Sequence, residues 1–152
     1  KTTRQMEKLR ENKDIAFVEL NATLVNDEAA FAEEVERCLA LEEEYISSGK
    51  SVCVYTTRVL ITADTGDKED DLRLTVTPSF VIAKGGITSS DVGTKALAVT
   101  RANVLGQIRP GIPVWQTGTE SKFPLTPYVI FPGNVGGDTT LKEAVEILMK
   151  TK

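Results

Sequence analysis

A glycine-rich turn carries the residue types in this sequence that are best suited to binding an anion. Gly85 and Gly86 follow directly after an apolar run at residues 80–83, and a cluster of hydroxyl side chains comes next. Adjacent glycines allow a tight turn and a close approach of a ligand to the backbone, and the free N–H groups at a helix start favour an anion. Lys84 adds a positive charge beside them. The pattern fits a phosphate-binding turn and, equally, a plain strand–turn–helix connection with Thr88 or Ser89 as the helix N-cap.

The turn matches neither the Walker pattern nor the GxGxxG fingerprint, which counts against a P-loop NTPase and a dinucleotide-dependent oxidoreductase. A second glycine-rich segment, residues 132–138, joins another apolar run to the last helical pattern. Its glycines can make room for an adenine, a ribose or a phosphate. An ordinary glycine turn, with Asp138 or Thr139 capping the helix, explains the same residues equally well.

Composition excludes several classes of chemistry. Histidine is absent, which removes Ser-His and Cys-His nucleophile pairs and histidine-containing zinc sites. The net charge of −4, without a run of Lys and Arg, argues against a nucleic-acid partner, and the apolar runs are too short to span a membrane. Cys38 and Cys53 are predicted to be free thiols. With no signal peptide pattern, they favour a cytoplasmic protein. No metal site is predicted from the residues themselves.

Apolar periodicity predicts strands that alternate with helices. One helix is expected to begin at Asn26 or Asp27, and its six glutamates (Glu33, Glu34, Glu36, Glu42, Glu43 and Glu44) are expected on its solvated face. Helices are predicted over 3–12, 27–47, 88–98 and 139–150, strands over 15–20, 51–56, 80–83, 104–108, 112–115 and 128–131, and a polar loop over 61–77. This order indicates an α/β fold, a three-layer sandwich with a largely parallel central sheet.

Ligands of such folds bind outside the carboxyl ends of the strands. Three polar or glycine-rich turns fall at those ends, at residues 56–58, 84–91 and 133–137, and we expect them to line one crevice. The helix after the second turn is predicted to be capped by a residue within 88–91. Asp91 is expected to stabilise the dipole of that helix from its first turn rather than to bind magnesium. Residues 109–111 are expected to form a structural Pro-Gly turn.

Three segments, at residues 82–92, 104–115 and 131–136, occur in the order found in a known domain family. Together they resemble the C-terminal nucleotide-binding domain of the four-carbon acid sugar kinase family, which was long catalogued as a domain of unknown function. The opening residues 1–5 are similar to the Thr-x-x-Gln helix start of that family. The resemblance covers most of the chain. Because the chain lacks an initial Met, we expect residues 1–152 to be the nucleotide-binding domain of a longer kinase.

The resemblance implies an ATP-dependent kinase that phosphorylates four-carbon sugar acids, such as threonate or erythronate, at the terminal hydroxyl, with ATP and Mg²⁺ as cofactors. The family's Asp-Asp-x-Thr-Gly motif is absent from this sequence. The catalytic residue is therefore unknown, and the resemblance implies that it lies in an N-terminal sugar-binding domain. That domain would be the partner of this one. A homodimer is also compatible with the resemblance. The nucleotide contacts implied by the resemblance are Gly85, Gly86, Ile87, Thr88, Ser89 and Gly133.

The sequence departs from the family between Thr75 and Pro78, where a helix is expected and only two residues intervene. Either the helix is deleted, or the printed sequence joins two segments that are separated in the protein; the polar run before it favours the second interpretation. Two other functions stay open. The first is a nucleotide- or phosphate-sensing domain without activity. The second is part of a fusion of the kinase with an aldolase or dehydrogenase.

Overall fold

The computed structural model describes residues 1–57 and 77–151, which divide into two compact units. The small unit contains residues 13–57, and the large unit contains residues 1–12 and 77–151. The predicted loop over 61–77 lies almost entirely outside the described residues, as does half of the segment near 75–78 where the resemblance led us to expect a further helix. Both of these sequence predictions therefore stay predictions.

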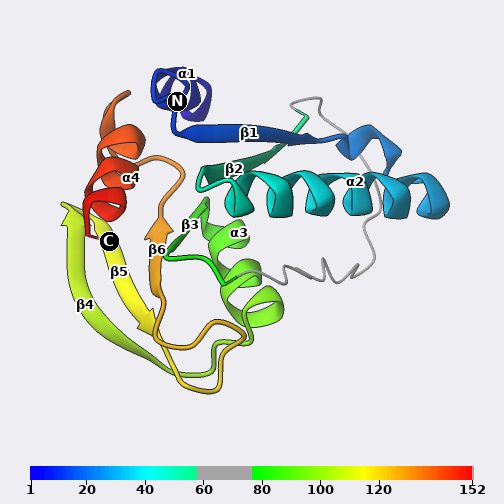
Figure 1. The fold of residues 1–152 in the computed structure, drawn as a ribbon. Coiled ribbons are helices and arrows are strands. Elements are labelled where there is room, and N and C mark those ends of the chain that lie inside the picture. The colour runs from blue at the N-terminus through cyan, green and yellow to red at the C-terminus, as the bar shows by residue number, and fades with distance from the viewer. Residues whose placement is uncertain (58–76, 152) are drawn as a thin grey trace. The chain divides into compact units, whose positions relative to one another are not determined.

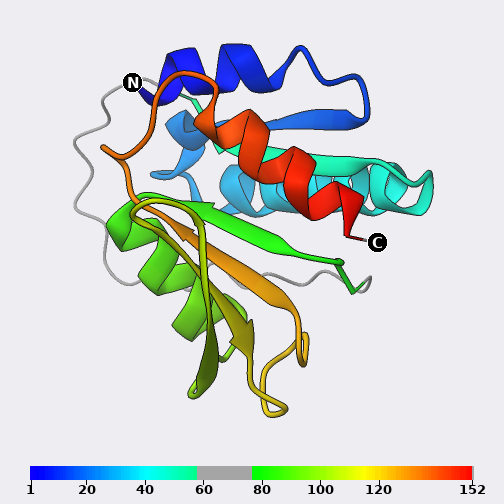
Figure 2. The same cartoon turned by 90° about the vertical axis from the view of Figure 1, so that its left-hand side faces the viewer.

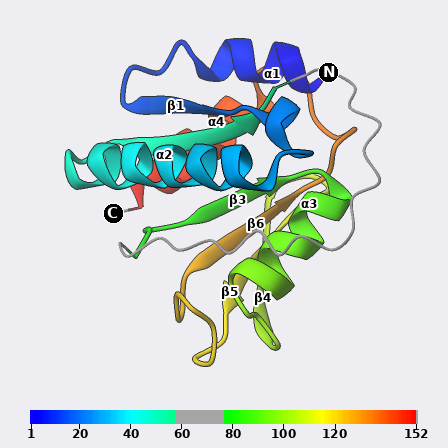
Figure 3. The same ribbon diagram turned by 90° about the vertical axis from the view of Figure 1, so that its right-hand side faces the viewer.

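The small unit is a parallel strand pair with one long helix. Strands β1 (Ile15–Leu20) and β2 (Ser51–Thr56) pair along their whole length. A short 3-10 helix, η1 (Ala22–Leu24), and helix α2 (Glu28–Ser47) connect the two strands, and Figure 3 shows α2 running alongside them. Continuous apolar runs favour buried strands, and the sequence predicted both strand boundaries correctly.

The ends of α2 follow the local chemistry of the sequence. The Asp27 carboxylate accepts a hydrogen bond from the Ala30 N–H at 3.0 Å, which satisfies a free donor of the first turn. Beyond the last turn, Gly49 adopts a φ of +85° and ends the helix. The expectation for its glutamates is wrong at Glu42, which is buried and whose pKa is raised to about 7 by burial and by the nearby charge of Glu43. Cys38 and Cys53 form no disulfide, as predicted.

The large unit contains a four-stranded sheet in the order β3-β6-β5-β4. The parallel pair is β3 (Val81–Lys84) with β6 (Pro127–Phe131). Strands β5 (Ile112–Thr117) and β4 (Ala102–Arg109) extend the sheet in antiparallel pairing. The predicted α/β class with parallel strands is therefore confirmed, and a hairpin is added to one side of the second sheet. The turn between β4 and β5 is the predicted Pro-Gly turn, with Gly111 at a φ of +77°.

Helices cover both faces of this sheet. Figure 1 shows helix α3 (Gly86–Asp91) and helix α4 (Thr140–Lys150) on opposite sides, and α3 continues into a π-helical turn, η2 (Val92–Ala96). Helix α1 (Thr2–Leu9) packs beside α4, as Figure 2 shows. The core contacts of α4 come from the residues predicted by its periodicity: Leu141, Ala144, Val145 and Leu148. No described helix combines the length and apolarity that crossing a membrane requires.

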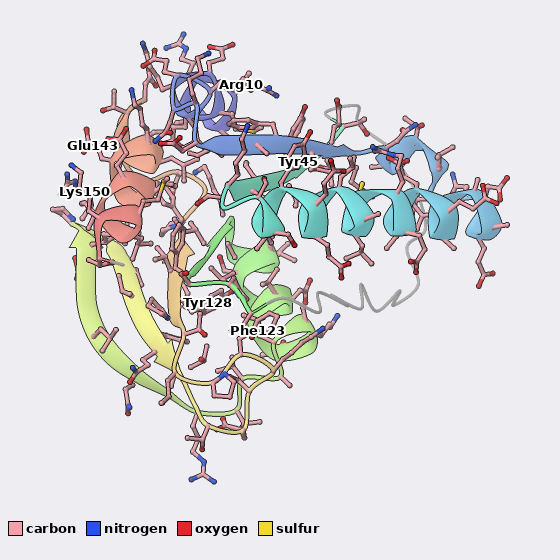
Figure 4. All side chains as sticks on the ribbon, viewed as in Figure 1. Arg10, Tyr45, Phe123, Tyr128, Glu143 and Lys150 are labelled. Atoms are coloured by element: carbon pink, nitrogen blue, oxygen red, sulfur yellow. The ribbon has the colours of Figure 1, made fainter. Side chains whose placement is uncertain are left out.

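A tyrosine in the sheet fixes the position of α3. In Figure 4 the Tyr128 side chain extends from β6 toward α3, and its hydroxyl donates to the Ser89 backbone carbonyl at 2.5 Å. Gly93 makes room for the ring, because a Cβ there would lie 3.3 Å from Tyr128 Cε1. Burial raises the pKa of Tyr128 to about 12, so the phenol keeps its proton and its donor role.

The start of α3 corrects two sequence predictions. The helix begins at Gly86 with Gly85 as N-cap, and no side chain caps it, so the prediction of a cap within residues 88–91 is wrong. The reason is the φ of +110° at Gly85, which turns the chain from strand to helix without a spacer. Asp91 is the last residue of α3 and lies 3.4 Å from the Lys95 ammonium, so it does not stabilise the helix dipole from the first turn.

Candidate functional site

The turn from β3 into α3 exposes backbone donors beside the end of the sheet. Gly85 still belongs to the β3/β6 ladder, because its N–H donates to the Phe131 carbonyl at 2.8 Å. Ser89 N–H makes the first bond of the helix, to the Gly85 carbonyl at 2.8 Å. The N–H groups of the preceding turn, Gly86 to Thr88, therefore lack intrahelical acceptors and are available to an anion.

The side chains of this turn differ in what they offer a ligand. Thr88 is exposed, and its hydroxyl lies 3.5 Å from the position that a Cβ on Gly85 would take. Ile87 is 82% exposed, which is high for so apolar a side chain. Ser89 is buried, and its hydroxyl donates to the Ala83 carbonyl at 2.8 Å. We therefore expect a ligand to meet Thr88 and Ile87, while the Ser89 hydroxyl serves the fold.

The second glycine-rich turn, between β6 and α4, lies against the first. A Cβ added to Gly133 would be 3.9 Å from the Gly85 Cα. The two turns are thus adjacent through glycines, which leaves the backbones bare where they meet. The structure brings together Gly85 to Thr88 and Gly133, as the sequence predicted for these two turns. The turn at residues 56–58 begins in the small unit, and its place in the same crevice stays a prediction.

Three side chains hold the second turn by its backbone carbonyls. The Lys84 ammonium lies 3.3 Å from the Pro132 carbonyl oxygen and 3.4 Å from that of Gly133. The Lys1 ammonium donates to the Asn134 carbonyl at 2.8 Å. From α1, the Gln5 carboxamide donates to the carbonyls of Val135 and Gly137, at 3.3 and 2.8 Å. The shape of the turn therefore depends on β3 and on α1.

Two of these three residues were missed as site residues by sequence reasoning. Gln5 is fully buried, although glutamine is not an apolar residue, so the periodicity of α1 gave no reason to place it inward. In the sequence, Lys1 looks like any solvated lysine. The resemblance of residues 1–5 to the helix start of the family was the signal that included them, but it implied no role for either side chain. Their contacts link positions more than 130 residues apart, and no local pattern contains such a link.

Lys84 has an unusual setting for a charged group. Its ammonium lies 4.4 Å from the centre of the Phe131 ring, within the range of a cation–π contact. Burial lowers the pKa of Lys84, and the positive charge of Lys1 lowers it further. Taken together, the two turns present N–H groups, a hydroxyl and ammonium groups. These are groups that bind anions, and the described parts of the turns contain no histidine to act as a general base.

The fold and the paired glycine turns define an α/β domain with bare backbone at one edge of its sheet, and comparison with known proteins shows what it is similar to. Residues 70–141 match the family model described as nucleotide-binding C-terminal domain. This match agrees with the resemblance to a nucleotide-binding C-terminal domain found in the sequence. No curated protein matches the chain significantly.

Solved structures share the fold. The chain is similar to a domain of unknown function (DUF1537) from Bordetella bronchiseptica, with a TM-score of 0.73 at 17% identity over 96% of this chain. In a second crystal form of that protein, the TM-score is 0.63 at 16% identity over the same share. Both are described as domain-swapped dimers with bound citrate. The chain spans 37% and 36% of the length of those two solved chains.

Proposed function

We propose that this domain is the ATP-binding lobe of a kinase that phosphorylates four-carbon sugar acids. The observation that carries the proposal is the close approach of the Gly85 and Gly133 turns: a Cβ added to Gly133 would lie 3.9 Å from the Gly85 Cα. The match of residues 70–141 to a nucleotide-binding family model supports it. A backbone without side chains lets phosphate oxygens reach N–H groups closely. Gly86 supports this reading, because a Cβ there would find no atom within 4 Å and only open space.

In this proposal the chain binds and orients the nucleotide. The N–H groups of Gly86, Ile87 and Thr88 hold phosphate oxygens, the Thr88 hydroxyl adds a donor, and Gly133 admits the nucleotide against the second turn. Mg²⁺, when bound, neutralises charge on the phosphates, which commonly supply much of its coordination. Phosphoryl transfer depends mainly on positioning and charge stabilisation, so a site without histidine is compatible with it.

The sugar acid and the group that activates its terminal hydroxyl belong to the rest of the kinase in this proposal, which follows the family resemblance. We expect the isolated domain to bind nucleotide weakly and to turn over no substrate. We include a cytoplasmic location, in keeping with two cysteines that form no disulfide and with the need for ATP. A homodimer is also included, because the similar solved protein is described as a dimer.

Calorimetry with ADP and Mg²⁺ on the full-length protein tests the site. Thr88→Ala removes one hydroxyl donor and is expected to weaken ADP binding by about three- to tenfold, the usual range for one hydrogen bond. Thr94→Ala is the matched control, because Thr94 is also exposed but bonds the Ser90 carbonyl of its own helix. Equal ADP affinity in wild type and Thr88→Ala would remove Thr88 from the site.

A coupled assay for ADP release tests the reaction itself. The full-length protein is screened against four-carbon sugar acids, including threonate and erythronate, with structurally matched neutral sugars as controls. ADP release that depends on a sugar acid supports the kinase. Tight nucleotide binding without turnover on any acid of this class would favour a sensing domain instead.

A further inference from the structure

The Lys84 ammonium is poorly satisfied where the structure places it. Its two hydrogen bonds to carbonyl oxygens, at 3.3 and 3.4 Å, are longer than the usual range for such donors. A lysine that served only to fasten the turn would be expected to make a shorter bond, as Lys1 does at 2.8 Å. The long contacts indicate an ammonium held near the turn with donor capacity to spare.

Among the described residues, the surroundings of the Lys84 charge are also unusual. Within the described part of the chain, no carboxylate forms an ion pair with it, whereas lysines Lys8, Lys95 and Lys142 each have one. The pKa of Lys84 is lowered by burial and then by the charge of Lys1, a second cation at the same turn. Two ammonium groups without an acid between them make a local positive field, and burial reduces its screening by water.

We propose that Lys84 binds the phosphate chain of the nucleotide, by exchanging its two long carbonyl contacts for a charge-assisted bond to phosphate oxygen. The proposal rests on the proposed function and adds to it a residue that supplies charge. Lys84 directly precedes Gly85, so its ammonium serves the same turn as the free N–H groups of α3. Its flexible four-carbon stem allows the head group to move while the methylenes stay on the Phe131 ring.

One alternative uses the same contacts. In it, Lys84 only fastens the second turn, and its charge is incidental. The two roles separate chemically, because a fastener needs N–H donors, whereas a phosphate ligand also needs the charge. Lys84→Gln keeps N–H donors for the Pro132 and Gly133 carbonyls and removes the charge. Lys84→Arg keeps the charge and changes the shape of the head group.

The experiment measures the affinities of ADP and adenosine for the full-length protein by calorimetry. Lys84→Gln is expected to lower ADP affinity about tenfold or more, the range for a lost charge-assisted bond, with adenosine affinity within about twofold of wild type. Lys84→Arg is expected to recover most of the ADP affinity. Lys122→Gln is the matched control, because Lys122 also lies over a phenylalanine ring, that of Phe123, at 5.8 Å.

A second measurement, the dependence of ADP affinity on salt concentration, tests the same proposal. The slope of ADP affinity against salt concentration is expected to be shallower in Lys84→Gln than in wild type, since one ion contact is lost. The proposal is overturned if Lys84→Gln binds ADP like wild type, or if it weakens ADP and adenosine equally. If the wild-type protein binds no ADP, the proposed function itself fails, and this outcome is distinct from both.

Discussion

Two adjacent glycines in the β3–α3 turn should respond to alanine in opposite ways. Gly85 has φ +110° and ψ 145°, close to a region that glycine alone adopts freely, so Gly85→Ala is expected to cost about 1–3 kcal/mol of stability. Gly86 has no such backbone conformation, and a Cβ there would contact nothing within 4 Å. Because Gly86 is the first residue of α3, Gly86→Ala is expected to be neutral or to stabilise by up to about 1 kcal/mol.

Gly86→Ala should weaken ADP binding although it leaves the stability of the protein unchanged or raises it. The added methyl group projects into the open space where we place phosphate, so ADP affinity is expected to fall about tenfold or more, or roughly 1.4 kcal/mol. Thermal melting of the full-length protein gives the stability order, and calorimetry with ADP gives the affinity. In Gly85→Ala a binding loss cannot be separated from the strain, whereas in Gly86→Ala it can.

Each half of this reasoning has its own refutation. Since about 1 kcal/mol shifts the melting temperature of a domain of this size class by several degrees, the two variants should be clearly separated in a melt. A Gly85→Ala protein that melts like wild type would refute the strain at that position. A Gly86→Ala protein that binds ADP like wild type would refute close approach of phosphate to the backbone, whatever its stability.

Two further predictions concern the supports of each unit. Tyr128→Phe removes the hydroxyl that donates to the Ser89 carbonyl, which keeps a bond from the Val92 N–H, and should cost about 0.5–1.5 kcal/mol in chemical denaturation; an unchanged midpoint would show that this hydroxyl does not hold α3. In the small unit, the pKa of Glu34 is lowered from 4.5 to about 2, mainly by the hydrogen bond from Arg37 and next by the hydrogen bond from the Asn21 N–H. Its stabilisation, about 1–2 kcal/mol after solvent screening, is therefore present above pH 4.5 and lost as the pH falls toward 2. Glu34→Gln should destabilise at pH 7, and this difference should shrink below pH 4.5; a constant difference would contradict the assignment.

Local chemistry explains which parts of the fold could be read from the sequence. Strands β1 and β2 are short, continuous apolar runs, and α4 has an unambiguous helical period, so their boundaries were predictable. The start of α3 was predicted wrongly because a glycine with a positive φ stands where most helices have a side-chain cap. Glu42 was misjudged because burial of a carboxylate depends on what packs against the helix, not on the helix itself.

The candidate site was predictable only in part, for a similar reason. That the Gly85 and Gly133 turns meet follows from the rule that the carboxyl ends of neighbouring parallel strands share one edge of the sheet, since β3 and β6 are such a pair. That Gln5 and Lys1 support the second turn follows from no rule about strands or periodicity. Such tertiary contacts between polar side chains and distant carbonyls appear only in the folded structure.

The two bonds from Gln5 to the second glycine turn also bear on the order in which the protein folds. They join residues 130 and 132 positions apart, with the whole small unit between them in the sequence. Contacts of such long range close the largest loops and tend to form late, because the loss of chain entropy precedes their stabilisation. The turn that faces Gly85 would then reach its final shape only after α1 docks, and during synthesis this is possible only once residues 135–137 have emerged.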